Sequence, residues 1–219
     1  RNNNHFDMKR ITLVFAFIAT IIGAKAQQET GTWSITPRVG INSSVLTMDD
    51  VQYLDDNGNT TVVKAQHRWG LTAGVETQYQ CWSQIALSAG LMYSNEGCQY
   101  DKKGDVGEWK QSLHFLSVPL LVNFYIEPDL LPGLSLKTGV QLGYLLQSKE
   151  TLMGTTNTNT DSFHRVNISI PAGISYEYHS FVADLRYNIG VANLCHHKVL
   201  DETWRSNSLW LTLGYQFRL

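Results

Sequence analysis

Hydrophobic and polar residues alternate along much of the chain, and the segment 134–146 shows the pattern most clearly. It reads LSLKTGVQLGYLL, with mainly leucine, valine and tyrosine at one parity and serine, lysine, glycine and glutamine at the other. A period of two is typical of a β-strand, whose successive side chains point to opposite faces. Strands of globular proteins usually have about five or six residues, whereas a tilted strand needs about ten to cross a bilayer. The segment is therefore predicted to span a membrane.

The same two-faced pattern recurs along the rest of the chain. It predicts seven more strands, near residues 33–45, 69–79, 84–94, 113–126, 166–177, 181–191 and 209–217. Short connections at 80–82, 127–133 and 178–180 alternate with long polar ones at 47–67, 95–112, 148–165 and 192–207. Short turns at one end and long loops at the other are typical of outer-membrane barrels. We therefore expect an all-β fold, an eight-stranded antiparallel up-and-down transmembrane β-barrel with both termini in the periplasm.

The polar face of these strands is predicted to line the barrel interior. Most of its residues are Gly, Ser, Thr, Asn and Gln, which fit the narrow lumen of an eight-stranded barrel. A soluble barrel would instead carry many Lys and Glu on a wet outer face. Charged residues of both signs share the polar face, and we expect them to pair in a lumen charge network that fills the barrel: Arg38, Glu76, Lys137, Asp184 and Arg186.

The N-terminal region predicts export from the cytoplasm. Met8, Lys9 and Arg10 precede an apolar segment over residues 11–22 and an Ala24-Lys25-Ala26 cleavage site, which are the three parts of a signal peptide. We therefore divide the chain into an upstream extension (1–7), a signal peptide (8–26) and an outer-membrane barrel (27–219). No basic run or arginine-rich face points to a nucleic-acid partner, and only 16% of the residues are charged.

Several of these segments together resemble a known family. The signal peptide and the segments WSITPRVGINSS, HFLSVPLLVNFY, LKTGVQLGYLL and LTLGYQF make the chain similar to the PorT-like outer-membrane β-barrel family, a porin-type group common in Bacteroidetes. The resemblance covers essentially the whole mature chain. It implies an integral outer-membrane barrel, and some members of the family are associated with secretion or assembly of exported proteins. The ending Phe217-Arg218-Leu219 departs from the terminal aromatic that the outer-membrane assembly machinery usually recognises.

The cysteines and histidines suggest one covalent contact and no metal centre. Cys98 and Cys195 are predicted in two outer loops and are candidates for a disulfide, because exported proteins reach an oxidising compartment. Cys195, His196 and His197 are adjacent in sequence, whereas zinc ligands usually come as spaced pairs. We therefore interpret them as part of a solvated loop, and we expect no metal and no cofactor.

Two outer loops have recognisable local patterns. Asn57-Gly58 predicts a small hairpin within the first loop. Residues 155–161, with the sequence TTNTNTD, are interpreted as a flexible polar tip. Neither pattern by itself identifies a ligand.

Four polar residues near the outer rim form a candidate catalytic set. They are Glu96, Ser112, His114 and His164, and their spacing does not mark a nucleophile with its base. The sequence therefore favours a structural or binding barrel that is not an enzyme and that makes contacts through its outer loops. A narrow porin-like channel and an envelope-lipid enzyme remain as alternatives. Expected partners are outer-membrane lipid and lipopolysaccharide, the assembly machinery, and secretion or surface proteins.

Overall fold

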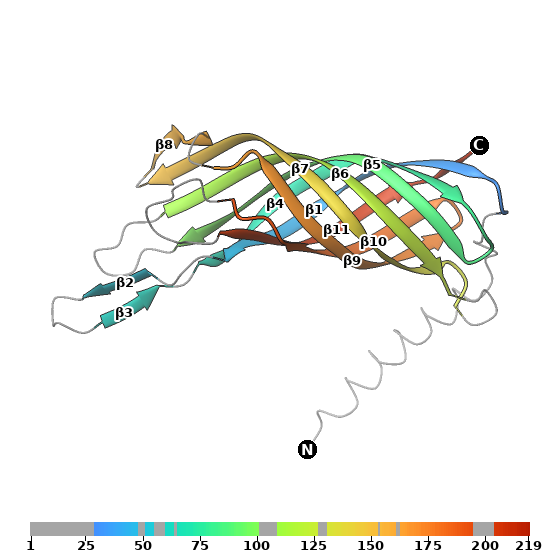
Figure 1. Cartoon of the computed structure of the whole chain (residues 1–219), viewed down its shortest axis with the longest axis horizontal. Helices are drawn as coiled ribbons and strands as arrows, with labels where there is room; N and C mark the ends of the chain where they lie inside the picture. The colour runs from blue at the N-terminus through green and yellow to red at the C-terminus, as the bar shows by residue number, and fades with distance from the viewer. Residues whose placement is uncertain are drawn as a thin grey trace, which may run out of the picture.

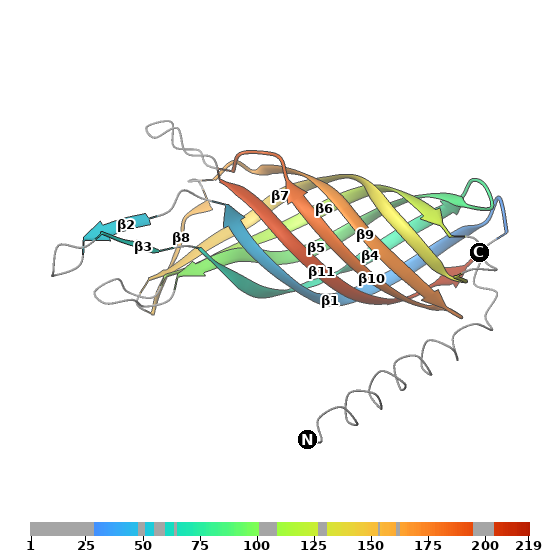
Figure 2. The same cartoon turned by 90° about the horizontal axis from the view of Figure 1, so that it is seen from below.

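Eight long strands form a closed cylinder in the computed structural model (Figures 1 and 2), which describes residues 29–47, 51–54, 60–63, 65–100, 109–126, 131–152, 154–160, 163–194 and 204–219. Each strand is antiparallel to its neighbours, and the pairing of the last long strand with the first closes the barrel. The strands are β1 (Trp33–Thr47), β4 (Gln66–Gln80), β5 (Ile85–Tyr100), β6 (Trp109–Tyr125), β7 (Leu134–Leu152), β9 (Val166–Tyr178), β10 (Phe181–Gly190) and β11 (Arg205–Tyr215). The predicted fold class is confirmed.

The alternation in sequence determines which side chains point outward. In β7, the side chain of Leu142 is 46% exposed on the outside of the barrel, whereas the adjacent Gln141 is 3% exposed. The other strands repeat this arrangement, with apolar residues outside and mainly polar residues inside. The exterior is therefore an apolar surface that suits hydrocarbon, as expected for a transmembrane barrel.

The two ends of the barrel differ in their connections. One end, here called the turn end, holds the short connections 81–84, 126–133 and 179–180, and the C-terminus lies there too (Figure 1). Gly133 and His179 adopt positive φ values of 81° and 58°, the left-handed conformation that tight turns require. A short strand, β12 (Phe217–Arg218), pairs with the start of β1 at this end. The opposite end, here called the loop end, carries the longer connections.

Two small additions extend the loop end. The strands β2 (Val51–Leu54) and β3 (Thr60–Val63) pair antiparallel, which confirms the predicted hairpin, although its turn at 55–59 lies outside the described residues. The strand β8 (Thr155–Thr158) pairs with the last four residues of β7. The prediction of a flexible tip was therefore wrong for these residues, because threonine is well suited to a strand and β7 offers backbone partners.

The strands β5 and β6 also extend further than the sequence indicated. The strand β5 continues to Tyr100 and β6 begins at Trp109, so residues 95–100 and 109–112 of the predicted second outer loop form paired strand instead. The rest of that loop, 101–108, lies outside the described residues. The predicted upstream extension and signal peptide lie outside the described residues, and their status remains a prediction. Among the described residues, no helix is long and apolar enough to cross a membrane.

Candidate functional site

The structure brings the five charged residues of the predicted lumen network into one buried cluster. Glu76 accepts contacts from Arg38, Lys137 and Arg186 at 3.1, 3.1 and 2.9 Å. Asp184 forms ion pairs with the same three cations, in the same order, at 3.5, 3.2 and 3.3 Å. The five side chains come from β1, β4, β7 and β10, so the cluster ties walls of the barrel that are far apart in sequence.

Glycines make room for these long side chains. Arg38 is paired across the sheet with Gly74 and Gly214, and both Lys137 and Arg186 are paired with Gly173. A methyl group added at Gly214 would lie 2.9 Å from Cγ of Arg38, closer than such carbons normally approach. The cations can therefore extend across the narrow lumen because the positions beside them carry no side chain.

Burial makes the balance of charge within the cluster important. All five side chains are nearly inaccessible to bulk solvent, so each ion depends on partners inside the barrel. Removing one partner of a buried ion pair typically costs about 3–5 kcal/mol, because an uncompensated charge remains. Here three cations share two carboxylates. Loss of a carboxylate would therefore leave a larger excess of positive charge, whereas loss of one cation would leave equal numbers of positive and negative groups.

A polar layer fills the lumen between this cluster and the turn end. Asn123 donates to Oε1 of Gln78 at 3.0 Å and to Oγ of Ser88 at 3.1 Å, and Gln78 donates to the hydroxyl of Tyr125 at 2.7 Å. Glu177 is buried at the same end and pairs with Arg218. Hydrogen-bonded side chains thus fill the lumen from the ionic cluster to the turn end.

A second buried carboxylate lies toward the loop end. Glu96 accepts hydrogen bonds from the hydroxyls of Ser94, Ser206 and Ser208 at 3.1, 2.7 and 3.2 Å. These partners come from β5 itself and from β11, which are far apart in sequence. Three hydroxyl donors therefore replace the water that the carboxylate would otherwise bind.

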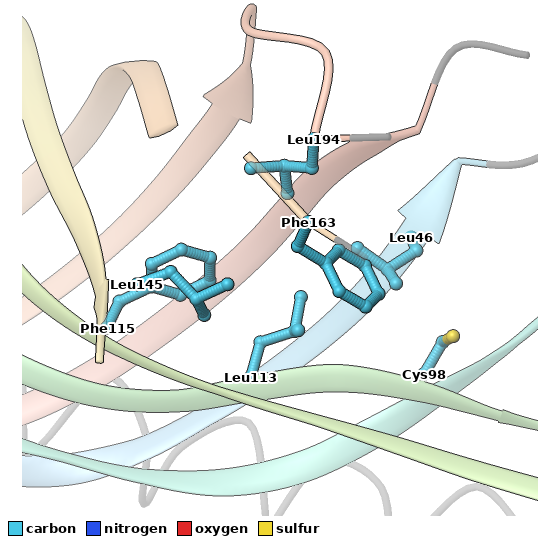
Figure 3. Close-up of a cluster of buried hydrophobic side chains, with 7 residues drawn as sticks. All are labelled: Leu46, Cys98, Leu113, Phe115, Leu145, Phe163 and Leu194. Carbon is cyan, nitrogen blue, oxygen red and sulfur yellow. The ribbon is translucent and has the colours of Figure 1, made fainter. Parts of the chain in front are cut away.

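An apolar cluster closes the lumen at the loop end. Figure 3 shows its side chains grouped together, with Phe163 and Leu194 contributed by the connections that follow β8 and β10. Backbone hydrogen bonds hold these two segments in place, from His164 N to Leu194 O and from Leu194 N to Trp204 O. The cluster consists of Leu46, Cys98, Leu113, Phe115, Leu145, Phe163 and Leu194.

The apolar cluster corrects two sequence-based expectations. The lumen is not uniformly hydrophilic, because its loop end is filled by aliphatic and aromatic side chains. Cys98 is not in an outer loop but in β5, where its side chain is buried within the cluster. Cys195 lies outside the described residues, so the Cys98–Cys195 disulfide remains a prediction.

The candidate catalytic residues do not converge. Glu96 is buried in the lumen, whereas the ring of His114 lies on the outer face, where Nδ1 is 2.6 Å from the hydroxyl of Tyr93. Ser112 is paired with Lys149 on the outer side of the wall, and His164 is exposed at the rim. The described residues contain no group of three side chains that could hold a metal ion. His196 and His197 lie outside the described part of the chain.

The fold and the filled lumen define a class of protein, a closed eight-stranded transmembrane β-barrel. The family model described as "outer membrane protein beta-barrel domain" matches residues 25–195, and the chain belongs to that family. It is therefore an integral outer-membrane protein. No curated protein sequence matches the chain significantly.

Several solved structures of outer-membrane barrels are similar to the chain. Ail, the attachment invasion locus protein of Yersinia pestis, is 16% identical with a TM-score of 0.45, over 86% of this chain and 100% of Ail. Neisserial surface protein A is 11% identical with a TM-score of 0.47, over 84% and 97%. The outer membrane protein OprG from Pseudomonas aeruginosa is 13% identical with a TM-score of 0.41, over 89% and 99%.

Proposed function

We propose that the chain is a closed outer-membrane scaffold that binds partner molecules at its loop end and does not conduct. The observation that carries the proposal is the double closure of the lumen. The ionic cluster around Glu76 and Asp184 fills the middle of the barrel, and the apolar cluster fills its loop end. A molecule crossing the barrel would have to displace both.

The two closures oppose conduction for different physical reasons. A hydrated ion entering the apolar cluster would lose its water without gaining polar ligands, which is how hydrophobic constrictions exclude ions. At the ionic cluster, each carboxylate already contacts three cations, so a mobile ion would compete with partners held at 2.9 to 3.5 Å. The function therefore has to reside on the exterior, the loops or the turns.

The proposed orientation places the loop end outside the cell and both termini in the periplasm. It is supported by the short connections at the turn end and by the position of β12 there. In this orientation the loops meet surface proteins or secretion partners, and the final residues Phe217-Arg218-Leu219 are read by the assembly machinery. We assign the chain to the PorT-like group of Bacteroidetes barrels on its sequence resemblance, and we propose a role in export or envelope assembly.

Single-channel recording in planar bilayers tests the closed lumen directly. Purified chain, folded in detergent and checked by heat-modifiable gel mobility, is expected to give no conductance steps, whereas a conducting porin added to the same bilayer does. A variant carrying Leu113→Ala, Phe115→Ala and Leu145→Ala should still not conduct, because the ionic cluster remains. If the unmodified chain gave conductance steps and the Lys137→Met variant did not, the proposal of a closed scaffold would be wrong and the narrow channel would be supported instead.

The envelope-lipid enzyme is less well supported by the geometry. Its acid and its histidine would have to act from opposite sides of the barrel wall, since Glu96 faces the lumen and His114 faces outward. Comparing lipid A from a deletion strain with lipid A from the parent strain tests this alternative. An unchanged acylation pattern is expected, and a missing acyl chain restored by the chain but not by its His114→Gln variant would contradict the proposal.

A further inference from the structure

Charged residues on the outside of the barrel are confined to its two ends. Among the described residues, the outward positions of the strands carry aliphatic, aromatic and small side chains over the whole middle of the barrel. At the loop end the outward or rim positions carry basic residues, while Glu96 turns into the lumen and Glu150 accepts a bond from the partly buried Trp109. These basic residues are Arg68, Lys110, His114, Lys149, Arg165 and Arg205.

Three of these basic residues, Arg68, His114 and Lys149, lie close together on one wall. Cross-strand pairing places Asn95 beside His114 and Ser112 beside Lys149, so these outward positions form two adjacent rows over β5, β6 and β7. Arg68 of β4 donates from Nη1 to Oδ1 of Asn95 at 2.9 Å. Asn95 is therefore a neighbour of both Arg68 and His114, and Lys149 lies diagonally across the strand pair from His114. This pairing places the three side chains around one stretch of the wall, where they can contact one anionic group.

One irregularity of the sheet and one side-chain hydrogen bond hold this arrangement in place. The register of β4 against β5 shifts between His67 and Thr72, and Arg68 lies within that shift. Such bulges re-aim side chains, and here the guanidinium is also fixed by a second bond, to the carbonyl of Glu96 at 3.2 Å. The hydroxyl of Tyr93 in β5 lies 2.6 Å from Nδ1 of His114 in β6, and this hydrogen bond orients the imidazole ring. Two of the three basic side chains, Arg68 and His114, are thus pre-organised.

The height of the group matches the edge of a hydrocarbon layer. His114 lies ten residues along β6 from Phe124, an exposed ring at the turn end. About ten residues of a tilted strand cross the apolar core of a bilayer. Directly below the cations the wall is apolar, with Leu71, Tyr93 and Leu116 exposed. Cationic and apolar surfaces in this order fit an amphiphile whose anionic head lies at the membrane boundary.

We propose that Arg68, His114 and Lys149 form a binding site for a phosphate group of the phosphorylated glycolipid of the outer leaflet, with its acyl chains lying against Leu71, Tyr93 and Leu116. Arginine and lysine are the side chains that most often bind phosphate, arginine through two parallel hydrogen bonds. At the turn end, by contrast, Arg218 is paired with the buried Glu177. The inference rests on the proposed orientation, with the loop end in the outer leaflet.

Native mass spectrometry of the full chain in detergent, with bisphosphorylated lipid A as the probe, tests the site. The variant R68Q/K149Q is expected to lower lipid A binding at least about tenfold, which corresponds to about 1.4 kcal/mol. The matched control R165Q/R205Q removes the same charge from the rim over other strands, and its binding should stay within about twofold. Dephosphorylated lipid A and phosphatidylglycerol should both bind the unmodified chain more weakly than lipid A.

Each contrary result has a definite meaning. Equal loss in the two variants would show diffuse attraction to the whole rim and would overturn the site. No loss in R68Q/K149Q, or equal binding of dephosphorylated lipid A, would overturn phosphate recognition. Equal binding of phosphatidylglycerol would overturn the assignment to a glycolipid.

Two further measurements separate this inference from the proposed function. Heat-modifiable mobility shows that each variant is folded before its lipid binding is compared. Maleimide labelling of a Thr156→Cys variant in whole cells, compared with labelling of the unmodified chain, reports whether the loop end is outside. Conductance would refute the closed scaffold and leave the lipid site intact, whereas a loop end inaccessible from outside would refute the orientation and the site together.

Discussion

The ionic cluster and the apolar cluster close the same lumen by opposite means. Around Glu76 and Asp184, long charged side chains span the barrel and are held by partners on other strands. Around Phe115 and Leu145, the lumen is closed by packing alone, with Phe163 and Leu194 added from the connections. The first depends on a balance of charge and the second on a match of volume. Substitutions should therefore affect the two regions according to different rules.

The largest effect is expected for Glu76→Gln in the ionic cluster. The amide keeps the shape of the side chain but leaves three buried cations with one carboxylate, so the free energy of unfolding should fall by about 3–5 kcal/mol. Urea titration in lipid vesicles, followed by tryptophan fluorescence, measures this change. Arg205→Gln at the exposed rim serves as the control and should change the free energy of unfolding by no more than about 0.5 kcal/mol. Similar losses in both variants would contradict a special role for the ionic cluster.

A smaller loss is expected for Leu145→Ala in the apolar cluster. Leu145 is fully buried, and its truncation should lower the free energy of unfolding by about 2–4 kcal/mol through lost contacts and an unfilled cavity. The adjacent Leu146 is 46% exposed on the outside of the barrel and provides a matched control. Lipid can fill the space that Leu146→Ala leaves, so its loss should be less than half as large. Equal losses would mean that the cluster is loosely packed.

The difference between the clusters also explains what could be predicted from sequence. Arg38, Glu76, Lys137, Asp184 and Arg186 stand out because charged residues are rare in these strands and all five fall at inward parity. A strict period of two thus places them in the lumen before any contact is known. Which cation meets which carboxylate depends on strand register and on the glycines beside them, and neither is visible in the alternation.

The alternation did not predict the apolar cluster, because hydrophobic residues at inward positions interrupt the pattern of polar residues there. Leu113 and Phe115 blur the alternation of β6, although they point into the lumen as regularly as Ser117 does. In β7 a register shift against β6 lies between Leu145 and Gln147, so Ser148 faces inward although it shares parity with the outward Leu146. Such a bulge reverses the faces, and periodicity alone cannot locate it.

A further test compares two kinds of loss within the ionic cluster. Lys137→Met leaves two cations for two carboxylates, and methionine keeps much of the lysine's apolar length. The free energy of unfolding should therefore fall by only about 1–2 kcal/mol, less than for Glu76→Gln. The same urea titration measures both variants side by side. If Lys137→Met were the more costly of the two, charge balance would not be what holds the cluster together.

The smallest perturbation is chemical labelling, which reports on packing without changing a residue. Cys98 is buried in the apolar cluster, whereas Cys81 is partly exposed at the turn end, so a maleimide should modify Cys81 in the folded barrel and Cys98 only after unfolding. Peptide mapping by mass spectrometry separates the sites and shows at the same time whether Cys98 is joined to Cys195. Leu113→Ala should accelerate the labelling of Cys98, because it removes a neighbour within the same cluster. Labelling of Cys98 as fast as Cys81 in the unmodified chain would show that the loop end is open, and the comparison between the two closures would fail.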